Sequence, residues 1–195
     1  MQFKFDLEGR NKYSYKEYRE MLDKLMADGE TTGKDHSDER IEATKSNIVK
    51  MNRSDKLTKL NDRLKSAILK SPKQRWILLI EGWSSDAAQN LPVINKMADF
   101  AFNIELDIML RDENLDIMDA FLTKKGRSIP KLISIDDKNK VLFTWGPRPE
   151  KMQARAMELK KAKEEYGQEI NQLYAKDRTV SIQAEFIELL SKLKA

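Results

Sequence analysis

Cysteine is absent from the 195-residue chain, and only one histidine is present. Without a thiol, the chain forms no disulfide, carries no thiolate nucleophile and offers no cysteine ligand to a metal. The lone histidine, His36, lies in a polar run from Asp28 to Glu39, where a solvated loop residue is expected rather than a base or a ligand. The sequence therefore indicates no metal site and no cofactor.

Long apolar runs and an excess of one charge are also missing. No stretch approaches the roughly 20 apolar residues of a membrane-spanning helix, and the N-terminus lacks the apolar segment of a signal peptide. We therefore expect a cytoplasmic protein with no membrane partner. The 36 basic and 32 acidic residues leave a net charge of +4, with both signs interspersed. Nucleic-acid binders more often concentrate basic residues on one element, so no nucleic-acid partner is expected.

The chain is organised around the stretch from Arg75 to Pro92. Its apolar run Trp76–Ile80 is too short for most helices and predicts a strand buried on both faces. The small and polar residues of Gly82–Asp86 then favour a tight turn and the start of a helix. From Ala87 onward apolar residues recur at helical spacing, and Pro92 is expected to kink this helix.

Apolar spacing and capping residues predict the other elements. Residues 2–7 alternate and indicate a short edge strand or an anchor. Helices are expected after the capping box of Ser14 and Glu17, over Asp38–Ser71 with a break near Asn52–Asp55, after Asp112–Asn114, after Pro149 with a bend at Gly167, and after Thr179. Strands are expected over 103–111, 131–135 and 141–145, with a hairpin loop joining the last two. This order predicts an α/β fold in which helices cover the faces of a mixed sheet.

The centre of the chain resembles the active-site segment of the thioredoxin family, in which a Trp precedes Cys-x-x-Cys. Trp83 ends the predicted buried strand, two small residues follow it, and Pro92 stands further along the next helix. Ser128-Ile129-Pro130-Lys131 resembles the family's cis-proline loop, which in thioredoxins pairs with the backbone of bound peptides. Gly146 resembles the glycine that closes the same surface. The likeness extends from Arg75 to Gly146 and implies a cis peptide bond before Pro130.

A closer likeness is to a bacterial thioredoxin-like group whose segment reads Trp-Cys-Gly-Asp-x-x-Gln-Asn-x-Pro. The matching residues here are Trp83, Asp86, Gln89, Asn90 and Pro92. The resemblance implies a thioredoxin-like fold, a central mixed sheet with flanking helices, that carries helical extensions at both ends. We expect residues 1–72 to form an N-terminal helical extension, 73–149 the thioredoxin-like core, and 150–195 C-terminal helices that pack on the core.

The residues on which the family's redox chemistry depends are different here. Ser84 stands where the nucleophilic cysteine is found, Ser85 where a glycine follows it, and Ala87 where the resolving cysteine is found. Leu78 occupies the place of a buried carboxylate that assists proton transfer in thioredoxins. Because a serine hydroxyl is far less acidic than a thiol, a helix N-terminus does not make it a redox nucleophile. Dithiol–disulfide exchange is excluded for this polypeptide, and no catalytic residue is assigned.

The leading hypothesis is a redox-inactive thioredoxin-like protein that binds a peptide or a partner protein. The predicted binding surface comprises Trp83, Ser84, Ser85, Asp86, Ile129, Pro130 and Gly146. One alternative is a thiol–disulfide oxidoreductase whose native nucleophilic cysteine is replaced by Ser84. A less favoured alternative is a transferase-like enzyme that uses Ser84 to hold the glutathione thiolate. A third assigns the helical extensions to an oligomer interface.

Each residue of this surface also has a purely structural interpretation. Ser84 and Ser85 suit the N-cap of a helix, and Asp86 complements the helix dipole in the first turn. Trp83 covers the edge of the sheet, and Pro130 preserves an inherited loop geometry.

Overall fold

The computed structural model of the chain describes residues 5–162 and 167–193. Its helices are α1 (Tyr15–Ala27), α2 (Asp38–Leu57), α3 (Asp62–Lys70), α4 (Ser85–Asp99), α5 (Leu115–Ala120), α6 (Glu150–Ala162), α7 (Gly167–Asp177) and α8 (Val180–Ser191), with a 3-10 turn, η1, over Arg111–Glu113. Its strands are β1 (Gln74–Ile80), β2 (Ile104–Leu110), β3 (Lys131–Ile135) and β4 (Val141–Trp145).

The strands form one mixed sheet of four strands in the order β2-β1-β3-β4. The central strand β1 pairs parallel with β2 and antiparallel with β3, and β4 pairs antiparallel with β3. In this register Leu78 lies between Ile108 and Leu132. The structure therefore confirms the predicted α/β fold with a mixed central sheet.

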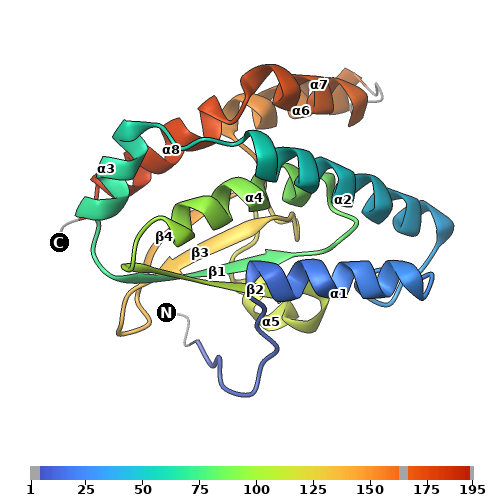
Figure 1. Cartoon of the computed structure of the whole chain (residues 1–195), viewed down its shortest axis with the longest axis horizontal. Coiled ribbons are helices and arrows are strands. Elements are labelled where there is room, and N and C mark those ends of the chain that lie inside the picture. The colour runs from blue at the N-terminus through green and yellow to red at the C-terminus, as the bar shows by residue number, and fades with distance from the viewer. Residues whose placement is uncertain (1–4, 163–166, 194–195) are drawn as a thin grey trace.

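Helices cover both faces of the sheet (Figure 1). Side chains of β1 alternate between them: Trp76, Leu78 and Ile80 join the core beneath α4, whereas Ile77 and Leu79 face α5. Because both faces are covered, β1 is an apolar run and not an alternating one. The end of β1 consequently lies inside the molecule and leads directly into α4.

The larger core contains side chains from all three predicted regions. Phe186 of α8 packs against the strand residues Trp76 and Trp145, with ring centroids 5.3 and 5.5 Å apart. Leu22 of α1 and Met51 of α2 are buried in the same cluster. The regions 1–72, 73–149 and 150–195 therefore share one apolar core, and their division into separate parts stays a prediction.

Some predicted boundaries are corrected by the structure. The prediction of two helices between residues 38 and 71 is confirmed, but the break lies at 58–61 and not near Asn52–Asp55, because α2 continues to Leu57 and α3 begins at Asp62. Asn61 starts α3 by accepting a hydrogen bond from the Leu64 amide at 2.9 Å, which explains where the new helix begins. At the N-terminus, the described residues 5–7 form no strand. Phe5 and Leu7 are buried as an anchor beneath the sheet; residues 2–4 lie outside the described part.

The helices differ in length, and α2, with 20 residues, is the longest that the structure describes. It carries charged side chains along its whole length. Within residues 5–162 and 167–193, no helix combines the length and the apolar character that a membrane crossing requires.

Candidate functional site

The turn between β1 and α4 is fastened by side chains from the N-terminal region. The Gly82 amide donates to the Thr32 hydroxyl at 2.8 Å, and the Gly82 carbonyl accepts from the Asn47 amide group at 2.9 Å. A Cβ at this glycine would lie 2.7 Å from a methyl carbon of Leu22 and 3.2 Å from one of Thr44. Glycine is thus required for α1 and α2 to pack this closely on the turn.

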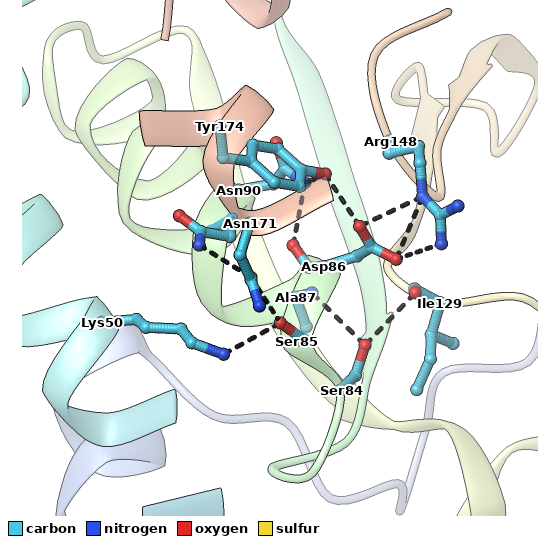
Figure 2. Close-up of polar contacts among 11 residues, drawn as sticks. Lys50, Ser84, Ser85, Asp86, Ala87, Asn90, Ile129, Arg148, Asn171 and Tyr174 are labelled. Atoms are coloured by element: carbon cyan, nitrogen blue, oxygen red, sulfur yellow. Dashed lines mark hydrogen bonds and ion pairs between the residues drawn. The ribbon is translucent and has the colours of Figure 1, made fainter. Parts of the chain in front are cut away.

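Ser84 is the N-cap of α4 and is 6% exposed. Its hydroxyl accepts a hydrogen bond from the Ala87 amide and donates its proton to the Ile129 carbonyl, each at 3.3 Å (Figure 2). A serine hydroxyl has one proton to donate. The Ser84 hydroxyl is therefore buried, and its one proton is used in a hydrogen bond within the chain.

The loop before β3 lies directly against this cap. The Ile129–Pro130 peptide bond is cis, as is Gly146–Pro147. Gly146 has φ +111°, and a Cβ there would lie 2.1 Å from the Pro130 carbonyl oxygen. Ser84, Ile129, Pro130 and Gly146, four of the predicted binding residues, are therefore brought together.

Asp86 links α4 to two later parts of the chain. Its carboxylate accepts hydrogen bonds from the Arg148 guanidinium, with Nε 3.1 Å from each oxygen, and from the Tyr174 hydroxyl at 2.9 Å. Asn90 donates to the same hydroxyl at 2.9 Å. Burial, together with the charge of Asp86, raises the pKa of Tyr174 well above its ordinary value. Asp86 thus does more than complement the helix dipole, because it holds α7 against α4.

Ser85 is the first residue of α4 and points toward α2 and α7, away from the Pro130 loop (Figure 2). Its hydroxyl accepts from the Lys50 ammonium at 3.0 Å and donates to the Asn171 side-chain carbonyl at 3.2 Å. Lys50 also donates to Asn47 at 3.1 Å. Burial lowers the pKa of Lys50, and the negative charge of Asp86 opposes this effect.

Trp83 is half-buried and lies between two guanidinium groups. The Arg40 carbon Cζ lies 3.8 Å from the ring centroid and that of Arg111 lies 4.9 Å from it. Both arginines are oriented by carboxylates, Arg40 by Asp35 and Arg111 by Asp112, at 2.7 Å in each case. The ring is held in place by cation–π contacts while part of it stays open to solvent.

A buried carboxyl group, that of Glu81, lies beside the site. Leu78 on β1 is fully buried and apolar, whereas Glu81, directly after β1, is fully buried and polar. One Glu81 oxygen accepts from the Asp112 amide at 2.9 Å, and Oε2 has no hydrogen-bond partner among the described residues. Burial raises the pKa of Glu81, and the neighbouring Thr32 hydroxyl and Asp112 amide partly offset that rise.

Sequence reasoning missed the residues that surround α4 from outside the thioredoxin-like segment. Lys50, Asn171 and Tyr174 are separated from their partners on α4 by 35 to 88 residues. Their side chains carry no spacing pattern that would identify them. Glu81 did have a visible signal, since a carboxylate directly after a buried strand is unusual.

This architecture is similar to that of known proteins. The family model described as Thioredoxin matches residues 33–185. No curated protein matches the sequence. The crystal structure of an HIV epitope-scaffold is similar, with a TM-score of 0.58 and 15% identity over 87% of this chain and 96% of its own.

The structure of a protein of unknown function from Pseudomonas aeruginosa is also similar. Its TM-score is 0.55, at 17% identity over 92% of this chain and 98% of its own. At these identities the two structures support the fold alone. The family match covers more than half of the sequence, and the chain belongs to the thioredoxin family.

Proposed function

We propose that the chain is a redox-inactive thioredoxin-family protein that binds an extended peptide or a segment of a partner protein. One observation supports this proposal most strongly: the hydroxyl at the nucleophile position caps α4 and donates its proton to the cis-proline loop. In this proposal Ser84 has a structural role and takes no part in a reaction. The framework around it, which in thioredoxins presents peptides to the thiol, is retained.

The loop also offers a backbone donor to a ligand. The Ile129 amide donates to no acceptor among the described residues. Extended peptides bind by backbone pairing of this kind, and adjacent side-chain contacts supply specificity. The half-buried ring of Trp83 supplies such a contact at the same end of the sheet. A peptide carbonyl at Ile129 and an apolar side chain at Trp83 are the two contacts that we propose.

The geometry opposes the glutathione alternative. A serine that held the glutathione thiolate would donate its proton to sulfur, but the Ser84 proton is donated to the Ile129 carbonyl. For the oxidoreductase alternative, the genomic codon for residue 84 is the direct test. The remaining expectations stay predictions: no nucleic-acid or membrane partner, an oligomer through the helical extensions, and a cytoplasmic location.

A peptide array probed with purified variants tests the proposal. We expect the wild-type chain to bind a defined set of extended peptides, and Trp83→Ala to lose them because the aromatic contact is removed. Phe102→Ala is the matched control, since Phe102 is a fully exposed aromatic in the turn after α4. Melting temperatures show whether each variant is folded. Peptide binding that is equal in Trp83→Ala and wild type would refute the proposed surface.

The pairing with Ile129 has a separate test. Replacing single peptide amides by esters weakens the carbonyl acceptor without changing the side chains. An ester that weakens the carbonyl paired with the Ile129 amide is expected to reduce affinity much more than an ester at a neighbouring position. A uniform response along the peptide would contradict backbone pairing at the loop.

A further inference from the structure

A cavity of about 220 Å³ lies beside Trp83, between α2, the first turn of α4 and α7. It is separate from the Pro130 loop but adjoins the predicted peptide surface through Trp83, Ser85 and Asp86. Its polar lining comes from Lys50, Asn171 and Arg148 as well as these residues. The cavity is therefore built by the helical extensions around a thioredoxin-type helix.

The lining that the structure describes has an unbalanced positive charge. Its ionisable side chains are Lys50, Asp86 and Arg148. Asp86 forms a mostly buried salt bridge with Arg148, and their side chains are 15% and 14% exposed. Lys50 forms no salt bridge with a described carboxylate, and its two acceptors are neutral oxygens of Asn47 and Ser85. Among the described residues, the half-buried Lys50 ammonium thus has no salt-bridge partner of its own.

Two donor groups that line this cavity also keep N–H bonds without an acceptor among the described residues. An ammonium group has three N–H donors, and Lys50 employs two of them. The Asn171 carbonyl oxygen accepts from Ser85 and Gln89, at 3.2 and 3.4 Å, while its NH₂ group has no acceptor among the described residues. A group with negative charge and two acceptor atoms would satisfy both donors.

We propose that this cavity binds the carboxylate of an acidic residue in the peptide that docks against Trp83. The inference rests on the proposed peptide-binding function and names the chemistry of its ligand. A carboxylate has two acceptor oxygens, matching one Lys50 N–H and the Asn171 NH₂ group, and its charge balances Lys50. The Trp83 ring, which borders both surfaces, places the acidic residue next to the apolar one in the peptide.

Calorimetric titration of matched peptides tests this specificity. Each peptide that the wild-type array selects is prepared with Asp or Glu, and with the isosteric Asn or Gln, at every acidic position. The acidic form is expected to bind about tenfold more tightly or better, because hydrogen bonds to charged groups are stronger. The preference is expected to shrink as salt is raised, since part of it is a charge interaction.

Lys50→Met removes the charge and keeps most of the stem, so it should abolish the preference for acid over amide. Lys45→Met is the matched control, because Lys45 lies exposed on the same helix. Asn171→Ala is expected to weaken the binding of acidic peptides selectively. This variant tests the site even if Lys50→Met fails to fold. Peptides with a free or an amidated C-terminus show whether the bound carboxylate is a side chain or a chain end.

The outcomes separate the two proposals. If wild type binds acidic and amide peptides equally, or if Lys50→Met and Asn171→Ala both keep the preference, the carboxylate site is refuted and peptide binding stands. If no peptide binds the wild-type chain, both proposals are refuted. A preference that Lys50→Met removes and Lys45→Met retains supports the carboxylate site.

Discussion

At the scale of single residues, Ser84 has a structural role at the start of α4. Its hydroxyl forms hydrogen bonds with the Ala87 amide and the Ile129 carbonyl. A cap of this kind stabilises a helix end whose amides have no partner within the helix. Ser84 therefore stabilises the start of α4 and its contact with the loop before β3.

Ser84→Ala is therefore expected to lower the free energy of unfolding by about 0.5–2 kcal/mol, the usual effect of removing a cap. Ser85→Ala, one residue along, should cost less, because Ser85 is not the N-cap and is partly exposed. Urea denaturation of both variants measures the difference. Equal losses of unfolding free energy in the two variants would show that the capping hydrogen bond is not the main contribution of Ser84 to stability.

Glu81 predicts a pH dependence of stability. Burial raises its pKa in the folded chain, so the folded state holds this proton more tightly than the unfolded state. Stability from this group is present at acidic pH and is lost as the pH rises from the unfolded-state pKa through the folded-state pKa. Glu81→Gln should remove that loss and raise the melting temperature at neutral pH. Melting temperatures of both proteins between pH 4 and 8 provide the measurement; parallel curves would contradict the prediction.

At the scale of secondary-structure elements, α4 is held at its N-terminal end by helices far away in the sequence. Asp86 contacts Arg148 after β4 and Tyr174 on α7, and Ser85 contacts Lys50 on α2 (Figure 2). The N-terminal end of α4 is therefore covered by α2, by α7 and by the segment that follows β4.

Breaking the Asp86–Arg148 pair from one side is expected to be costly. Arg148→Met leaves a mostly buried carboxylate without its cation and should destabilise the chain by about 3–5 kcal/mol. Asp86→Asn combined with Arg148→Met should cost less than Arg148→Met alone, because residue 86 then carries no buried negative charge. Denaturant titrations of the single and double variants form a double-mutant cycle. Additive losses would argue against this coupling.

Local sequence patterns predicted the elements better than they predicted their contacts. The strands 131–135 and 141–145 match the structure, because their apolar runs end at turn residues that stop a strand. The boundary between α2 and α3 was misplaced, because charged residues such as Asp55 continue α2 despite a weak apolar pattern. The contacts of Tyr174 and Asn171 were beyond prediction, since pairing across more than 80 residues is set by packing and not by spacing.

At the scale of the whole molecule, the N-terminal helices, the sheet and helix α8 share one interior. The fully buried Phe186 ring packs against Trp76, Phe143 and Trp145 and connects the last helix to strands β1 and β4. Helices α1 and α2 enter the same cluster from the other end of the chain. We therefore expect the protein to unfold as one cooperative unit.

Phe186→Ala tests this coupling, because it removes the ring at the centre of the aromatic cluster. A loss of about 3–5 kcal/mol is expected from the lost burial and the cavity that remains. Phe102→Ala is the control, because its ring is fully exposed and its removal should change stability by less than about 0.5 kcal/mol. Guanidinium unfolding followed by near- and far-ultraviolet circular dichroism should give coincident transitions in wild type. Separate transitions would show that an extension unfolds on its own.

The position of Trp83 gives this protein a built-in optical reporter. Of the three tryptophans in the chain, Trp76 and Trp145 are buried in the core, whereas Trp83 is half-buried between Arg40 and Arg111. Iodide, an anionic quencher drawn by the two guanidinium groups, should therefore quench the fluorescence of one indole selectively. A ligand that covers Trp83 should protect this emission from iodide. Reduced quenching would therefore report ligand binding in the unlabelled wild-type chain.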